Sequence, residues 1–588
     1  MNLVSCKKIV GNRYFVFVVL AIFFLIGLNI YSKDKFLMNI DERTSNTVSI
    51  VSGEVYQQPL LNVRQFETGA FIVSLKRNAE TGFNGGVKFT LVDQDKVVQT
   101  WDVPVGVLSD LVPLHLTNPL KIDSSNNYKL QMQLYGDIKS VDVVGKTFGS
   151  NNTFTFAAYN QHNTKFRFYF LLSVSIFYLI LIVLGRQHWN NFIIGVMLVF
   201  LGLEYICIYP MLIGPDETSH WIKAYEISKG QFFPLSFTKE LGGYSFVPYT
   251  IFNPHINSAV IDSSNLITIE DANVAVYSFI NYLPLVLGIK ISSLFTDKVG
   301  IIYLTAKFIN YAISVFFLYE ALRILPFGKK MLLIIILNPI TLQQLTIVSA
   351  DGFTFSLSVY FIAYVLWCYK KEVINLKDKI VLTIVLLLLS QCKIIYVALM
   401  WILILLFKVD GKKLKSFIVI LWGTTAIFSL TWLKIASSYL IPTNKGANSG
   451  EQTNFIIHHF VDFLAIGYNT FISLSGNLVS QLFGSGLGTF NVLVNPIVWI
   501  SFFIMFILSL KYNQPSINSE RVFKNSTFAS GVLVLVSMIV CFLIATSLYI
   551  QWTPLRSPLI EGLQGRYFIP SIILFGLALN FNSTDEEY

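Results

Sequence analysis

The apolar stretch NFIIGVMLVFLGLEYICIYPML (residues 191–212) is followed at once by IGPDETSH (residues 213–220). The first stretch is long enough to cross a bilayer, since about 20 apolar residues suffice. The second places the carboxylates of Asp216 and Glu217 and the imidazole of His220 at the boundary of that span. Taking an ionisable group out of water costs several kcal/mol, so such groups at a membrane boundary point to a function.

The whole chain has the composition of an integral membrane protein. Its 588 residues are 54% hydrophobic and 13% charged, whereas a soluble domain carries about 25% charged residues. The net charge of +9 comes mostly from short loops between apolar spans, which is typical of cytoplasmic loops. The sequence has no nucleic-acid-binding signature, and its five cysteines show no metal-binding spacing.

The N-terminal third predicts an anchor followed by a polar domain. Residues 1–31 combine a basic start with an apolar stretch and no cleavage site, which is typical of an uncleaved signal anchor with a cytoplasmic N-terminus. Residues 32–165 contain alternating runs such as VKFTL (87–91) and YKLQMQL (128–134), separated by turns. They predict an extracellular β-sandwich inserted after the first span.

Residues 166–581 predict the transmembrane domain, and residues 582–588 a cytoplasmic tail. Loop charge decides how the ambiguous stretch 276–295 is placed: if it crossed, eleven basic loop residues would lie outside, against the positive-inside rule. We therefore interpret it as an interfacial or re-entrant helix, with Pro284 in its middle. The result is a polytopic α-helical protein of about twelve spans, near 14–30, 166–184, 192–212, 300–322, 330–348, 352–369, 379–390, 394–407, 416–438, 491–510, 527–549 and 567–581.

This topology brings several polar residues to the outer face together with Asp216. Asp216, Glu217 and His220 offer a base with hydrogen-bonding support for a hydroxyl nucleophile, or a cap for the helix that follows. Asp351, in a very short outer loop, is either a second acidic group of this site or a cap of the next helix.

Cationic candidates lie at two further outer positions. Lys393, with Tyr396 one turn later, interrupts an apolar stretch, and either snorkels to the interface or holds a phosphate. In the segment 561–570, Arg566 can bind a phosphate through two hydrogen bonds or can anchor at the headgroups. The pair His458-His459 lacks partners at metal-ligand spacing and is expected at the surface.

Four motifs together resemble a family of bacterial multi-spanning proteins related to the GT-C glycosyltransferase superfamily. The resemblance extends from about residue 166 to 581 and is most specific at 214–230 and 561–570. The motifs are Pro215-Asp216-Glu217 with His220 and Ala224-Tyr225, Ser349-x-Asp351, Lys393-x-x-Tyr396 and Gln564-Gly565-Arg566-Tyr567-Phe568-x-Pro570.

The resemblance implies an inverting hexosyl- or N-acetylhexosaminyl-transferase facing the outside of the bacterial cell membrane. Its donor would be a polyprenyl-phosphate sugar and its acceptor a cell-wall polysaccharide. Asp216 would be the base, oriented by Glu217 or His220, and Asp351 the second acidic position. A lone Asp351 without an Asp-x-Asp pattern gives no support for a divalent metal, and no cofactor is required. The donor phosphate would be bound by Lys393, Tyr396, Gln564, Arg566 and Tyr567.

Two other classes of function remain open. A transporter or flippase of lipid-linked sugars usually shows internal repeats and charges near the bilayer midplane. The sequence has no internal repeat, and its notable charges gather at one face, which favours an enzyme. A surface sensor would use the β-rich domain and would leave the outer acidic and basic residues without a role.

Overall fold

The computed structural model divides the chain into two units, one of residues 30–169 and one of residues 1–29 with 170–588. The predicted signal anchor in 1–31 and the tail after Asn582 lie outside the described residues. Those are 37–38, 47–59, 66–73, 75–76, 85–94, 96–104, 112–122, 128–148, 151–154, 156–159, 170–176, 191–209, 211–212, 214–233, 235–236, 243–248, 251, 260–261, 266–270, 274, 277–409, 412–437, 448–487, 496–511 and 526–582.

The unit of residues 30–169 is built from antiparallel strands. The two runs that predicted strands lie in β6 (Gly85–Asp93) and β9 (Tyr128–Gly136), which pair with Phe89 opposite Met132. Alternation places Phe89 in the core and Lys88 in solvent. The sheets have the orders β3-β9-β6-β7, β1-β12-β4-β8 and β11-β10-β2, with β5 on β10. Buried residues of β2 to β10 form one hydrophobic core.

The remaining strands of this unit have the following bounds: β1 Leu37–Met38, β2 Thr47–Val51, β3 Val55–Pro59, β4 Phe66–Val73, β5 Leu75–Lys76, β7 Lys96–Pro104, β8 Val112–Ile122, β10 Ser140–Phe148, β11 Asn151–Phe154 and β12 Phe156–Tyr159.

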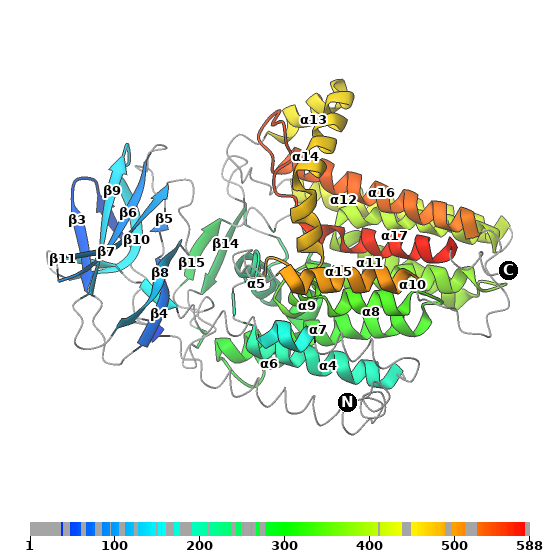
Figure 1. The fold of residues 1–588 in the computed structure, drawn as a ribbon, viewed down its shortest axis with the longest axis horizontal. Coiled ribbons are helices and arrows are strands. Elements are labelled where there is room, and N and C mark those ends of the chain that lie inside the picture. The colour runs from blue at the N-terminus through cyan, green and yellow to red at the C-terminus, as the bar shows by residue number, and fades with distance from the viewer. Residues whose placement is uncertain are drawn as a thin grey trace. The chain divides into compact units, whose positions relative to one another are not determined.

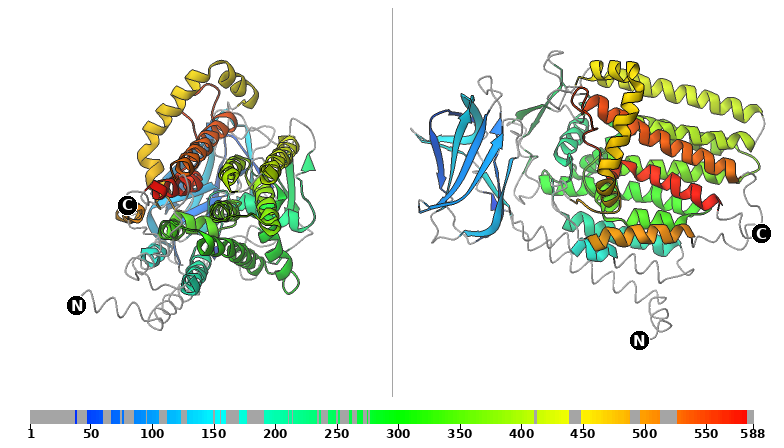
Figure 2. Two further views of the ribbon diagram at one scale, coloured as in Figure 1. Left: turned by 90° about the vertical axis from the view of Figure 1, so that its right-hand side faces the viewer. Right: turned by 45° about the horizontal axis from the view of Figure 1, so that its top comes forward.

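The second unit is mostly helical. Figures 1 and 2 show its long helices running side by side, with α14 crossing them near one end. The helices are α4 Asn191–Ile208, α5 Glu217–Ser228, η3 Phe279–Tyr282, α6 Leu283–Ser292, α7 Val299–Ile324, α8 Lys329–Leu337, α9 Pro339–Thr346, α10 Asp351–Tyr369, α11 Leu376–Cys392, η4 Ile394–Lys408, α12 Lys412–Ser437, α13 Ser449–His458, α14 Phe460–Leu482, α15 Pro496–Lys511, α16 Ser526–Gln551, η5 Gly565–Phe568 and α17 Ile569–Asn582. A small sheet joins β13 (Leu235–Ser236), β14 (Gly243–Pro248) and β15 (Leu266–Glu270).

The protein is an α-helical membrane protein. Among the described residues, four helices are long and apolar enough to cross a bilayer: α7, α10, α12 and α16. The helices α13 and α14 together pass the same test but are bent by 106°. The remaining apolar helices are shorter, so the expected twelve spans stay a prediction.

Two expected helices have a different form in the structure. The run 330–348 is divided into α8 and α9, because Asn338 starts a new helix: its side chain accepts from the backbone N–H of Ile340 at 3.1 Å, and Pro339 fills the first turn. In the stretch 276–295, Pro284 stands in the first turn of α6 and does not interrupt it. The helical part, Phe279–Ser292, is shorter than the about 20 residues that a span needs.

Candidate functional site

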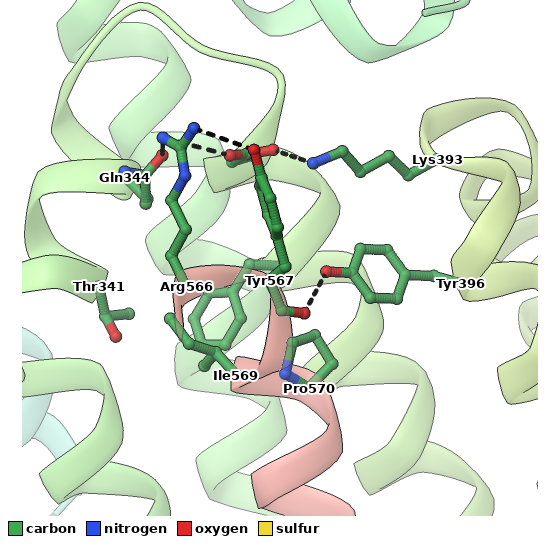
Figure 3. Close-up of a pocket in the computed structure, with 10 residues that line it drawn as sticks. Thr341, Gln344, Lys393, Tyr396, Arg566, Tyr567, Ile569 and Pro570 are labelled. Atoms are coloured by element: carbon green, nitrogen blue, oxygen red, sulfur yellow. Dashed lines mark hydrogen bonds and ion pairs between the residues drawn. The ribbon is translucent and has the colours of Figure 1, made fainter. Parts of the chain in front are cut away.

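A cavity of about 20 Å³ lies between segments that are far apart in the sequence (Figure 3). This volume holds about one ordered water molecule. Five of the predicted site residues line the cavity, and Asp216, Glu217, His220 and Gln564 do not. The lining residues are Thr341 and Gln344 of α9, Asp351 and Phe355 of α10, Lys393, Tyr396 of η4, Arg566 and Tyr567 of η5, and Ile569 and Pro570 of α17.

Asp351 carries the central carboxylate of this cavity. It is the first residue of α10, and its oxygens lie 2.5 Å from Nζ of Lys393 and 3.8 Å from Nη1 of Arg566. The N-cap position of α10 belongs to Ala350. The side chain of Asp351 therefore does not cap the helix and instead forms ion pairs with Lys393 and Arg566. Close packing sets its position: a Cβ atom at Gly352 would lie 2.6 Å from the carbonyl oxygen of Gln344.

The side chain of Lys393 is 14% exposed and pairs with Asp351. Lys393 ends α11 by adopting an extended backbone with φ −143° and ψ 117°, after which the chain continues as η4. Its ammonium, besides the contact with Asp351, lies 5.1 Å from the ring centre of Tyr567 and 5.7 Å from that of Tyr277. The break between α11 and η4 therefore places a cation in the cavity from a segment that is otherwise apolar.

Arg566 lies between the two acidic residues of the prediction. Its side chain is 4% exposed, with Nη1 3.8 Å from Asp351 and Nη2 3.9 Å from Asp216. Gln344, with its amide oriented to match donors and acceptors, donates to Asp351 and accepts from Arg566, both at 3.2 Å. The cavity thus contains two cations that share one carboxylate.

The backbone beside Arg566 is held by helix α14. The N–H of Gly565 donates to the side-chain oxygen of Gln481 at 2.9 Å, and a Cβ atom at Gly565 would lie 2.4 Å from the carbonyl oxygen of Leu478. The hydroxyl of Tyr396 donates to the backbone carbonyl of Tyr567 at 2.9 Å. Tyr396 therefore holds the backbone next to Arg566. Its hydroxyl proton is engaged in this hydrogen bond and is not free to bind a phosphate.

Asp216 stands at the rim, outside the cavity lining. It precedes α5 with φ 56° and ψ 14°, in the left-handed region, and its side chain makes no capping hydrogen bond. The carboxylate is 57% exposed. The capping interpretation of this side chain is therefore wrong, and the carboxylate is accessible to a substrate.

Glu217 faces away from the cavity. Its side chain is fully buried and accepts hydrogen bonds from the backbone N–H groups of Gly214 and Val348 and from the hydroxyl of Tyr303. Glu217 was expected to orient Asp216, and these contacts would let it do so only through the backbone of the loop. Its partners could not be predicted, because two of the donors are backbone groups, which leave no mark in the sequence.

His220 is buried behind Asp216. Its Nδ1 atom lies 2.7 Å from the hydroxyl of Tyr282, and its ring is 5.4 Å from that of Tyr277. Burial lowers the pKa of His220 to about 4, although the nearby carboxylates of Asp216 and Asp351 oppose this shift. The imidazole is therefore neutral at pH 7 and bonds to Tyr282 without a charge of its own.

Other predicted positions contribute less to the site. Gln564 precedes η5, and its side-chain oxygen is buried with no hydrogen-bond partner among the described residues. The pair His458-His459 is exposed, as expected. Within the described ranges, no three His, Cys, Asp or Glu side chains gather as a metal site.

Sequence reasoning missed Gln344, Thr341 and Tyr277. Gln343-Gln344 is a polar pair inside an apolar run, which is a usable signal, because amides in a membrane segment need partners. Tyr277 carried no comparable signal, since aromatic residues are frequent in this chain.

No curated protein and no solved structure is detectably similar to the chain. One family model matches residues 198–575, which is more than half of the chain and includes every segment that lines the cavity. The β-rich unit lies outside the matched residues. The chain therefore belongs to the membrane-protein family described as "Predicted membrane protein (DUF2142)".

Proposed function

We propose that the protein is a GT-C-type inverting glycosyltransferase of a bacterial cell membrane. It takes a sugar from a polyprenyl-phosphate carrier and transfers it to a cell-surface polysaccharide. The proposal includes about twelve spans, an outward-facing site and an extracellular β-sandwich formed by the N-terminal unit. The observation that carries it is the Lys393–Asp351–Arg566 cluster, which gathers two cations around a small cavity.

The cations suit the phosphate of a lipid-linked donor. Lys393 offers a compact ammonium and Arg566 a planar fork of N–H donors, the groups that proteins use for phosphate. Asp351 now engages both, and the cavity is only about 20 Å³. A phosphate can bind there only if Asp351 shares or releases its cations. Asp351 thus keeps two buried positive charges paired until the donor arrives.

Asp216 is the base in this proposal. Its exposed carboxylate lies 3.9 Å from Arg566, next to the proposed phosphate site. The acceptor hydroxyl attacks the anomeric carbon from the face opposite the phosphate, and Asp216 takes the hydroxyl proton. The bond between the anomeric carbon and the phosphate oxygen breaks with its electron pair, which leaves polyprenyl phosphate beside Lys393 and Arg566.

Binding of undecaprenyl phosphate to the purified protein tests the phosphate site. We expect Lys393→Ala and Arg566→Ala each to weaken binding about 10-fold or more, since a charge-assisted hydrogen bond contributes about 1.5–3 kcal/mol. Lys377→Ala is the matched control, because this lysine is exposed on α11 outside the cavity. The double variant Asp351→Asn/Lys393→Ala removes the carboxylate together with one of its cations, and Arg566 keeps Asp216 at 3.9 Å, so no buried charge of this cluster is left without a partner. Equal affinities in all variants would show that the assignment is wrong.

Cell-wall sugar composition tests the reaction itself. A deletion strain is expected to lack one sugar that the wild-type gene restores and the double variant Asp351→Asn/Lys393→Ala does not. Unchanged composition on deletion would contradict a glycosyltransferase. Movement of labelled polyprenyl-phosphate sugar across vesicles that contain the protein, without transfer, would instead support a flippase.

A further inference from the structure

The buried carboxylate of Glu217 connects the two loops that carry the acidic residues of the site. Its Oε2 accepts from the N–H of Gly214 at 2.8 Å, and its Oε1 accepts from the N–H of Val348 at 2.9 Å. Gly214 is two residues before Asp216, and Val348 is three residues before Asp351. One side chain thus binds the backbone just ahead of each acidic residue.

The two loops also touch directly at this point. A Cβ atom at Gly214 would lie 2.7 Å from Cδ1 of Ile347 and 3.0 Å from Oε2 of Glu217. Gly214 is therefore packed against the side chain of Ile347 and against Glu217 itself. The hydrogen bonds of Glu217 limit the separation of the two loops, and this packing fills the space between them.

Helix α7 supplies a fixed point for the arrangement. The hydroxyl of Tyr303 donates to Oε1 of Glu217 at 2.5 Å and accepts from the N–H of Leu212 at 3.2 Å. The ring of Tyr303 packs edge-on against Trp221 of α5, with centroids 5.0 Å apart. Both loops are thereby held to α7 through a residue that is fully buried.

We propose that Glu217 is a positioning residue, which fixes the distance between Asp216 and Asp351 by binding the backbone of the two loops. Arg566 lies between the two carboxylates on the side of the cavity. The effect of Glu217 on sugar transfer rests on the proposed function, whereas its effect on the two loops does not. The geometry excludes a role as base, because all three donors point at its oxygens and the side chain does not line the cavity.

Substitution by glutamine separates this role from simple space filling. A carboxylate accepts from all the donors around it, whereas an amide of the same size has one acceptor oxygen and adds two N–H donors. In Glu217→Gln at least one backbone N–H, of Gly214 or of Val348, loses its partner. Glu217→Asp keeps both acceptors but is one methylene shorter, so it is expected to restore part of the effect.

Hydrogen–deuterium exchange tests the loops without any substrate. In Glu217→Gln, at least one of the two peptides that cover 212–217 and 345–351 is expected to exchange about tenfold faster, the effect of losing one hydrogen bond of about 1.4 kcal/mol. Glu226→Gln is the matched control, since Glu226 is a buried glutamate on the same helix. It is expected to leave both peptides unchanged. Unchanged exchange in Glu217→Gln, or equal acceleration in the control, would overturn the proposal.

A second measurement distinguishes positioning from loss of fold. Glu217→Gln is expected to lower the sugar content of the complemented deletion strain about 100-fold, because a misplaced catalytic group costs about this factor. Its affinity for undecaprenyl phosphate is expected to change less than threefold, since Lys393 and Arg566 remain. Equal losses of both would show a general structural role and contradict positioning.

Tyr303→Phe provides an intermediate case. It removes one donor to Glu217 and the acceptor of the Leu212 N–H. Both backbone contacts of Glu217 remain, so transfer is expected to fall less than in Glu217→Gln. A larger fall in Tyr303→Phe would contradict the proposal. If the wild-type protein transfers no sugar while the exchange results hold, the proposed function fails and the connection between the loops stands.

Discussion

The backbone of Asp216 lies in the left-handed region, with φ 56° and ψ 14°. This region costs most L-residues about 1–2 kcal/mol, and Asp and Asn tolerate it best. The conformation does not serve a helix cap, because the side chain makes no capping hydrogen bond. It turns the carboxylate outward, beside Arg566. A strained backbone that exposes one carboxylate next to a buried cation is consistent with a functional position.

Asp216→Asn tests this residue, because asparagine also tolerates the left-handed region and only the charge is lost. We expect sugar transfer to fall about 10²- to 10⁴-fold, the usual contribution of a general base, while the amount of protein in the membrane stays the same. Cell-wall sugar analysis and immunoblotting of the membranes measure both. Asp462→Asn, at an exposed carboxylate of α14, is the control. Near-normal transfer in Asp216→Asn would exclude Asp216 as the base.

At the residue scale, the sequence predicted the charged members of the cavity and not their supports. Asp351, Lys393 and Arg566 stand out because charge is rare in an apolar chain. Glu217 stands out for the same reason, yet its partner Val348 is 131 residues away and contributes only a backbone N–H. Composition identifies a buried charge, but only the fold shows which oxygen meets which donor.

At the scale of the elements, two interrupted helices form the cavity. The break between α11 and η4 was predictable, because Lys393 and its neighbours divide an apolar run. The break between α8 and α9 was not, because Pro339 in an apolar run fits either a continuous, kinked helix or a new first turn. The side chain of Asn338 decides between them: it caps Ile340 and donates to the backbone carbonyl of Leu482 at 2.8 Å.

Close contact between α9 and α10 then places Asp351 against Gln344. A Cβ atom at Gly352 would lie 2.6 Å from the carbonyl oxygen of Gln344 and 3.0 Å from Cα of Leu345. Gly352→Ala is expected to separate the two helices, to destabilise the protein by about 1–3 kcal/mol and to reduce undecaprenyl phosphate binding. Thermal unfolding in detergent measures the first effect.

Gly531→Ala is the matched control for this element. Gly531 lies in α16, and a Cβ atom there meets nothing within 4 Å. This substitution is expected to leave the melting temperature unchanged or to raise it, since alanine favours a helix by about 1 kcal/mol over glycine. Equal melting temperatures for Gly352→Ala and Gly531→Ala would contradict a tight contact between α9 and α10.

At the scale of the whole molecule, composition separates a β-rich unit from a helical unit, and the structure divides the chain at residues 30–169. The order of the helices followed from the apolar runs. So did the short lengths of α11 and α17, which were expected at 379–390 and 567–581 and have fewer than the about 20 residues that an α-helical span needs. Length and composition alone assign four spans among the described helices, so the number of crossings has to be settled by loop charge and by experiment.

Cysteine labelling from each side of the membrane tests the twelve-span topology. The basic loop before α11 is predicted to be cytoplasmic and offers the first labelling site. Its residue Asn375 is unsuitable, because it caps α11 by accepting from the N–H of Asp378. Val373, in the same loop and 67% exposed, avoids this problem. In a cysteine-free background, Val373→Cys is expected to react only from the inside, since basic loops stay cytoplasmic. Ser449→Cys, exposed at the start of α13, is expected to react only from the outside. The reverse pattern would place the Asp351–Lys393–Arg566 cavity on the cytoplasmic side, where an outward-facing transferase has no acceptor.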